Sequence, residues 1–85
     1  MRYRAKIAVY LKPGVPDPEG YSVKDYLKDR GYIWIQSVRS GKFWEVTVEA
    51  ASKEEAGELV ERICLDPLAN IVKDNYDILE LEELR

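Results

Sequence analysis

Few side chains in this 85-residue chain are suited to catalysis. The chain has no histidine, so it lacks the usual general base near neutral pH and can form neither a Ser-His-Asp nor a Cys-His arrangement. Its one cysteine, Cys64, falls on an apolar helical stripe, where a buried structural thiol is expected rather than a nucleophile. A structural zinc site would need further thiolate or imidazole ligands. We therefore predict no catalytic residues and no metal site.

Carboxylates are plentiful, but their spacing is typical of solvated surfaces. One group lies in the first turn or on the polar side of a predicted helix, where early acidic residues favour the helix dipole: Glu54, Glu55, Glu58 and Glu61. The acidic run from Glu80 to Glu83 is broken by Leu81 and indicates a solubilising strand end. Glycines occur singly, without the spacing of a phosphate-binding loop.

Composition narrows the class of protein further. With 13 basic and 16 acidic residues the net charge is -3, which argues against a general nucleic-acid-binding surface. No apolar run is long enough to span a bilayer, and a lone cysteine suits the reducing cytoplasm. Residues 1–85 are expected to form a single domain with a small core. Because one cysteine allows no internal disulfide, association with another chain is the expected source of extra stability.

Hydrophobic periodicity predicts the elements of the first half. Residues 2–12 alternate as a strand with one buried face, and residues 18–30 have helical spacing. Asp17 followed by Pro18 indicates an N-cap and a first helical residue, and Gly31 is a C-terminal stop. Residues 32–39 and 42–50 are rich in β-branched and aromatic residues, so Ser40-Gly41 is predicted to be a two-residue hairpin turn.

The second half predicts one helix and one strand. Ser52 and Glu55 have the spacing of a capping box, and the helix that they begin ends at Pro67. Its core-facing stripe comprises Ala56, Leu59, Val60, Ile63 and Cys64. Residues 68–75 are expected to form a loop and residues 76–84 a strand. This order predicts an α+β fold, a ferredoxin-like βαββαβ sandwich with a four-stranded antiparallel sheet and two helices on one face.

The uncovered face of such a sheet would carry more apolar surface than solvent exposure requires. Together with polar neighbours that include Glu45 and Glu49, it would present Tyr32, Trp34, Val38 and Phe43. Arg4 and Lys6 would lie near the two glutamates, giving a mixed-charge face able to pair with a second copy. We expect a homodimer or homotetramer formed through these residues. The alternative is shielding of the face by the acidic end of the last strand.

Two other classes of binding protein share this fold. RNA-binding modules place stacking aromatics on the same sheet, and Phe43 could stack, but Glu45 and Glu49 would repel the phosphate backbone. A stand-alone oligomeric regulatory domain that binds a small ligand is the remaining alternative, although no residue pattern identifies a ligand. We expect neither a nucleic acid nor a membrane as partner.

The chain carries a series of short motifs, and the first is Leu11-Lys12-x-Gly14-Val15-x-Asp17-Pro18-x-Gly20, in a loop stiffened by prolines and so suited to binding. The series continues through Gly31-Tyr32, Val38-Arg39-x-Gly41-Lys42, Glu45, Cys64, Leu68-Ala69-Asn70, Val72 and Tyr76. In their order and spacing these motifs resemble the PurS family, the small subunit of bacterial and archaeal phosphoribosylformylglycinamidine (FGAM) synthase. The chain departs from the family pattern at Pro67, where the family usually lacks proline, and at Ile71, where the family usually has proline.

The resemblance implies a non-catalytic subunit of an ATP- and glutamine-dependent ligase of purine biosynthesis. Such a subunit bridges a PurL-type synthetase, which uses ATP and magnesium, and a PurQ-type glutaminase, and it supports ammonia transfer between them. It binds no cofactor itself. The residues implied to contact the larger subunits are Lys12, Gly14, Val15, Asp17, Pro18, Gly20, Gly41, Lys42, Leu68, Ala69 and Asn70. Lys12 and Lys42 are the strongest candidates, because the sequence gives neither a local structural role.

Overall fold

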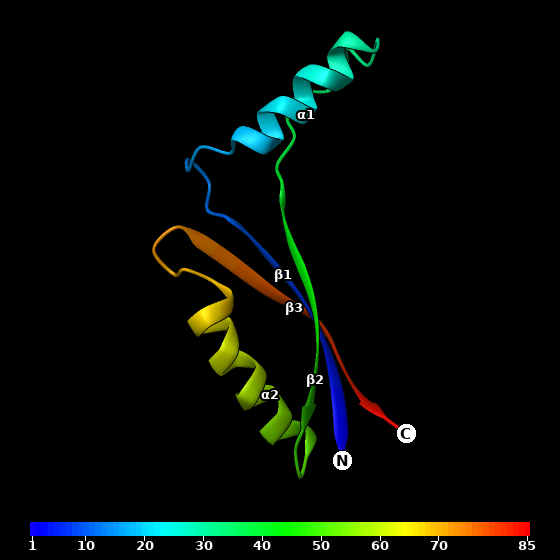
Figure 1. The fold of residues 1–85 in the computed structure, drawn as a ribbon, viewed down its shortest axis with the longest axis vertical. Helices are drawn as coiled ribbons and strands as arrows, with labels where there is room; N and C mark the ends of the chain where they lie inside the picture. Colours follow the sequence, from blue (N-terminus) through cyan, green and yellow to red (C-terminus); the bar gives the residue numbers. More distant parts are fainter.

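The computed structural model describes residues 1–85 and contains one antiparallel sheet and two helices. The strands β1 (Arg2–Leu11), β2 (Gly41–Glu49) and β3 (Asp74–Leu84) lie in the order β2-β1-β3. Helix α1 (Pro18–Asp29) follows β1, and helix α2 (Lys53–Ile63) with the short segment η1 (Cys64–Leu68) connects β2 to β3. In Figure 1, α2 lies along the sheet, whereas α1 extends from one end of it. Neither helix is both long enough and apolar enough to cross a membrane.

The core lies between the sheet and α2, as the periodicity predicted. Alternate residues of β1, namely Tyr3, Ala5, Ile7 and Val9, are buried on the face that α2 covers. The helix contributes Ala56 and Val60, and Cys64 follows at its end. Ser52 caps α2 by accepting a hydrogen bond from the Glu55 backbone N–H. Burial, followed by the nearby charge of Glu61, raises the pKa of the Cys64 thiol, which agrees with its predicted structural role.

On the other face of the sheet, basic side chains of β1 lie opposite acidic side chains of β2 and β3. On β1, Arg2 is opposite Glu49 of β2 and Arg4 is opposite Glu82 of β3, whereas Lys6 has an acidic residue opposite it on both strands. Lys6 is opposite Glu45 on β2 and forms a 3.3 Å ion pair with Glu80 on β3. Arg4 pairs with Glu82, and its hydrogen bond is the main cause of the lowered pKa of that carboxylate. Because opposite charges face each other across the strands, these pairs favour the observed register.

The prediction of a four-stranded sheet is wrong. Residues 32–40 contain no regular strand, and Ser40-Gly41 does not form a hairpin turn. A two-residue hairpin turn needs positive φ, and among the glycines only Gly14 and Gly31 have it. Gly41 instead pairs with Tyr10 at the start of β2, where an added Cβ would approach the Val9 carbonyl oxygen to 2.8 Å. The glycine therefore allows β1 and β2 to approach each other closely.

The expectation that both helices cover one face of the sheet is also wrong. Helix α1 makes very few contacts with other elements, and Gly20 is its only buried residue. The chain is consequently elongated, with extents of 51 × 29 × 14 Å and a radius of gyration of 16.4 Å. A compact domain of this length would have a radius of gyration of about 12 Å. The structure is α+β with a three-stranded sheet and one helix left without a partner.

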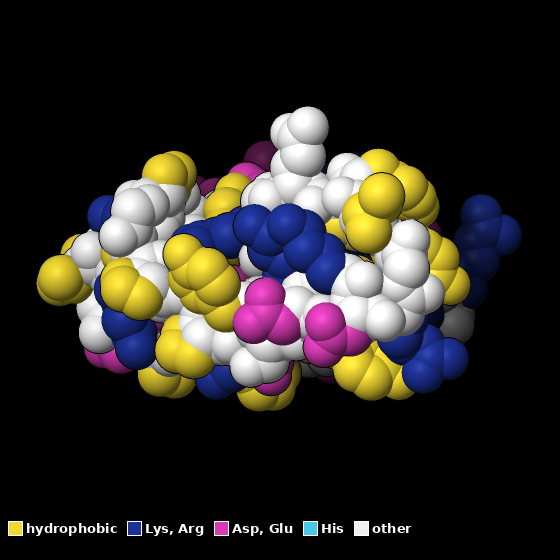
Figure 2. Space-filling model, turned by 90° about the horizontal axis from the view of Figure 1, so that it is seen from above, with side chains coloured by type: hydrophobic (Ala, Val, Ile, Leu, Met, Phe, Trp, Pro, Cys, Tyr) yellow, Lys and Arg dark blue, Asp and Glu magenta, His cyan; other side chains and the backbone are white.

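We call residues 18–40 the arm, because they extend together from the end of the sheet (Figure 1). The arm exposes much apolar surface for a segment of this length, at Tyr21, Val23, Tyr26, Tyr32, Ile33 and Trp34. Trp34 is 72% exposed and meets Tyr32 edge-to-face, with ring centroids 6.0 Å apart. Viewed from the end where the arm lies, apolar side chains flank a central group of Lys and Arg (Figure 2).

Candidate partner-binding site

Asp17 connects the start of α1 to the start of β2. Its carboxylate accepts hydrogen bonds from the Gly20 backbone N–H at 3.0 Å and from the Ser40 backbone N–H and hydroxyl at 2.6 and 2.7 Å. These bonds, the one from the Ser40 N–H first, lower the pKa of Asp17 from its usual 3.8 to about 2. The predicted N-cap is confirmed, and the same side chain fixes where the arm returns to the sheet.

Arg39 and Lys12 hold the loop between β1 and α1. The Arg39 guanidinium donates to the backbone carbonyl oxygens of Lys12 and Val15, at 3.3 and 3.1 Å. Lys12 Nζ donates a hydrogen bond to the carbonyl oxygen of Ile71 at 2.7 Å. The Lys12 backbone N–H donates to the carbonyl oxygen of Lys73 at 2.8 Å. The loop is therefore attached to both the end of the arm and the loop before β3. Lys12 has a structural role that the sequence did not indicate.

Asn70 organises the loop before β3. Its side-chain oxygen accepts a hydrogen bond from the Val72 N–H at 3.0 Å, and its backbone N–H donates to the Asp74 carboxylate at 2.9 Å. The Asn70 carbonyl oxygen accepts from the N–H groups of Lys73 and Asp74, at 3.0 and 2.7 Å. These bonds satisfy the backbone of a tight turn, so Asn70 acts as a turn cap.

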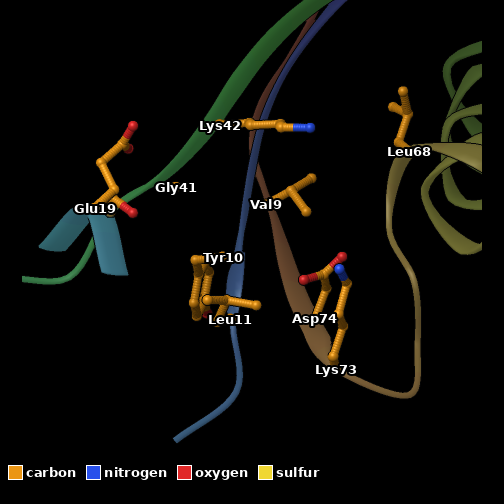
Figure 3. A pocket seen from close by; sticks show the side chains of 10 residues that line it. Val9, Tyr10, Leu11, Glu19, Gly41, Lys42, Leu68, Lys73 and Asp74 are labelled. Carbon is orange, nitrogen blue, oxygen red and sulfur yellow. The ribbon is translucent and has the colours of Figure 1, made fainter. Parts of the chain in front are cut away.

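A hollow of about 230 Å³ opens where these segments meet. Figure 3 shows Val9 and Lys42 pointing from the strands toward Leu68, with Lys73 and Asp74 at one side. The Lys42 side chain is exposed and forms no hydrogen bond or ion pair within the chain. It is therefore available to an external group, unlike Lys12.

The structure brings the residues implied by the resemblance to one end of the sheet. The β1–α1 connection and the start of α1 contain Lys12, Gly14, Val15, Asp17 and Gly20. Strand β2 begins with Gly41 and Lys42, and the segment before β3 contains Leu68, Ala69 and Asn70. Pro18 is the first residue of α1. Their individual roles differ: Asp17 and Gly20 are buried, whereas Pro18 and Lys42 are exposed. An added Cβ at Gly20 would clash with the Val38 carbonyl oxygen at 2.4 Å, so close packing explains that glycine.

The four residues expected to mediate self-association do not share a sheet face. Tyr32 and Trp34 lie at the far part of the arm, Val38 is half-buried near its return, and Phe43 lies on β2 opposite Ala8. Tyr32, Trp34 and Phe43 are nevertheless exposed, at 45, 72 and 58%. Sequence reasoning assigned no role to Arg39 or to the exposed pair Ile71 and Val72. Two adjacent β-branched residues in a loop were the available signal.

These features define a class of protein: a small α+β domain with an exposed apolar arm and a braced pair of loops, both suited to contacts with other chains. A family model described as PurS, phosphoribosylformylglycinamidine (FGAM) synthase, matches residues 4–82. The chain belongs to the PurS family.

Individual relatives agree along nearly the whole chain. The FGAM synthase subunit PurS of Bacillus subtilis is 38% identical over 82 residues, which cover 96% of this chain and 95% of that protein. A solved structure of PurS from Thermus thermophilus has a TM-score of 0.88 and 37% identity, covering 100% of both chains. A chain in the structure of PurLQS from Thermotoga maritima has a TM-score of 0.83 and 31% identity, with 99% of each chain covered.

Proposed function

We propose that this chain acts as the bridging small subunit of FGAM synthase, between a PurL-type synthetase and a PurQ-type glutaminase. The supporting observation is the convergence of its PurS-like motifs at one braced end of the sheet. The name PurLQS of the Thermotoga maritima structure supports an assembly of this composition. The protein would work in the cytoplasm, in agreement with its single unpaired cysteine.

The role is architectural, and its physical basis is the chemistry of ammonia. Ammonia that escapes into water near neutral pH is protonated and is no longer a nucleophile. A subunit that aligns the glutaminase with the synthetase keeps ammonia close to the acceptor and away from bulk water. The chain needs no catalytic residue for this task, only surfaces that hold two partners in a fixed relation.

The test is reconstitution with purified synthetase and glutaminase subunits. Adding this chain should raise glutamine-dependent FGAM formation while leaving the ammonia-dependent rate of the synthetase nearly unchanged. Glutamine-dependent activity of full size without the chain would contradict the bridging role. A parallel rise in the ammonia-dependent rate would instead indicate an effect on the synthetase itself.

We also propose that the chain self-associates through its arm, with Tyr32, Trp34, Val38 and Phe43 at or near the contact. The arm has few contacts within its own chain, and the free edge of β2 leaves backbone N–H and C=O groups unpaired. Residues 35–39 of a second copy, which belong to no helix, strand or turn of their own chain, offer backbone partners for that edge, and its α1 offers apolar side chains. Such a reciprocal exchange gives a closed dimer with two identical contacts.

A further inference from the structure

A second hollow, of about 130 Å³, lies between the start of α1 and the segment that returns from the arm to the sheet. On the helix side its lining residues are spaced four and three positions apart, which places them on one side of the helix. On the other side they are three consecutive residues. The full lining comprises Asp17, Tyr21, Lys24, Ser37, Val38 and Arg39. Pockets for whole small molecules usually exceed about 300 Å³, so this hollow has room for one compact group.

The hollow is lined by hydrogen-bond donors that have no partner within the chain. The Tyr21 hydroxyl, the Lys24 ammonium and the Ser37 hydroxyl take part in no side-chain hydrogen bond. Arg39 donates through Nη2 alone, which leaves its Nη1 and Nε groups free. Because Lys24 is half-buried, its unpaired charge is less well solvated than that of an exposed lysine.

The charges around the hollow favour an anion. Neither Lys24 nor Arg39 takes part in any of the ion pairs of the chain. The acidic lining residue, Asp17, is 2% exposed, and its charge is compensated mainly by its three hydrogen bonds, with Arg39 the smallest cause of its lowered pKa. The acidic residues of α1 itself are exposed and do not line the hollow: Glu19, Asp25 and Asp29. From this end of the molecule, Lys and Arg side chains gather at the centre, with acidic side chains at one side (Figure 2).

We propose that this hollow binds a phosphate group, whose oxygens accept hydrogen bonds from the Lys24 ammonium and the free nitrogens of the Arg39 guanidinium. A phosphate presents several acceptor oxygens around one centre, and a guanidinium matches two of them at once. The Tyr21 and Ser37 hydroxyls supply donors for the remaining oxygens. The site does not depend on the proposed bridging function. The backbone pairing proposed for residues 35–39 leaves their side chains available to it, because side chains project out of the plane of a sheet.

The experiment titrates the full-length chain with inorganic phosphate, replacing chloride at constant ionic strength, and follows calorimetric heat and melting temperature. Phosphate should bind saturably and raise the melting temperature, because a ligand of the folded state stabilises it. Lys24→Met removes the charge but keeps an unbranched side chain, and it should weaken binding about tenfold. Tyr21→Phe removes one hydroxyl and should weaken binding less. Lys28→Met is the matched control, since Lys28 is an exposed lysine of the same helix outside the hollow, and it should leave the affinity nearly unchanged.

The absence of saturable phosphate binding by the wild type overturns the site, as does an affinity that Lys24→Met leaves unchanged. Equal weakening by Lys24→Met and Lys28→Met also overturns it, because phosphate would then respond only to overall charge. Ribose 5-phosphate identifies the source of the group: tighter binding than inorganic phosphate assigns the hollow to a sugar phosphate, and weaker binding assigns it to free phosphate. Melting temperatures without phosphate show whether the variants fold. None of these results changes the outcome of the reconstitution that tests the bridging function.

Discussion

At the scale of the residue, Asp17 is the clearest case of one side chain with several structural roles. A local rule, that aspartate before proline caps a helix, predicts its bond to the Gly20 N–H. No local rule predicts the two bonds to Ser40, which lies 23 positions further along the chain. The three hydrogen bonds donated to the buried Asp17 carboxylate favour its ionised form, so this side chain stabilises the fold most when it is ionised.

Replacing this carboxylate should therefore destabilise the fold in a pH-dependent way. The pKa of Asp17 is about 2 in the folded chain and usually 3.8, so its contribution is complete above about pH 4 and is lost as pH falls toward 2. Asp17→Asn should lower the melting temperature at pH 7 by about 5 °C, since an amide presents N–H groups to one of its donors. The gap to wild type should narrow as pH falls from 4 to 2.

Asp25→Asn is the matched control, because Asp25 is an exposed carboxylate on the same helix. Scanning calorimetry at fixed protein concentration gives both comparisons. Equal melting temperatures for wild type and Asp17→Asn at pH 7, or a gap that stays constant down to pH 2, would exclude the stabilising role of the ionised form.

At the scale of the element, the sequence was informative wherever structure depends on neighbouring residues. The alternation of β1, the caps at Asp17 and Ser52 and the apolar stripe of α2 all involve short separations, and each prediction is confirmed. The prediction of a hairpin after α1 was wrong, because β-branched residues favour an extended backbone but do not identify its partner strand. Residues 33 and 34 form a turn and residues 35–40 belong to no strand, while Asp17 and Arg39 fix the end of this segment beside the β1–α1 loop.

For the candidate site too, the sequence predicted what depends on neighbouring residues and not what depends on tertiary contacts. The motifs located the correct end of the sheet, because the loops that carry them follow β1 and precede β3, two paired strands. The motifs did not distinguish residues free to contact a partner from residues that stabilise the loops. Lys12, to which the sequence gave no local structural role, donates a hydrogen bond to the Ile71 carbonyl oxygen. That distinction depends on tertiary hydrogen bonds between the two loops, which the spacing of residues within either loop does not encode.

Gly41 offers a test of how β2 begins. Gly41→Ala adds a Cβ that would lie 2.8 Å from the Val9 carbonyl oxygen, so β2 must move away from β1 and the free energy of unfolding should fall by about 1–3 kcal/mol. Gly57→Ala is the control, because its Cβ would meet only Leu81 at 3.8 Å and alanine favours the α2 helix by about 0.5–1 kcal/mol. Urea unfolding at one protein concentration measures both. A Gly41→Ala variant as stable as wild type would show that the strands separate without cost.

At the scale of the whole molecule, the chain is too extended to be explained by its own contacts. Only 11 of 85 residues are buried, and the arm adds length to the molecule without adding to its core. A chain of this size has little stability to spare, so an arm with exposed aromatics is expected to be covered in the working protein.

If copies of the chain associate through the arm, the oligomeric state and the environment of Trp34 should change together. Trp34→Glu should convert the wild-type oligomer to monomers in sedimentation velocity at micromolar concentration, because it would place a charge in an apolar contact. Trp34 and Trp44, the chain's two tryptophans, are 72 and 40% exposed in the single chain, so dilution of the wild type should shift emission to longer wavelength as the copies separate. Trp34→Phe is the matched control, since it keeps an aromatic anchor and should remain oligomeric. A wild type that sediments as a monomer, with emission independent of concentration, would refute self-association and leave the arm to a different partner.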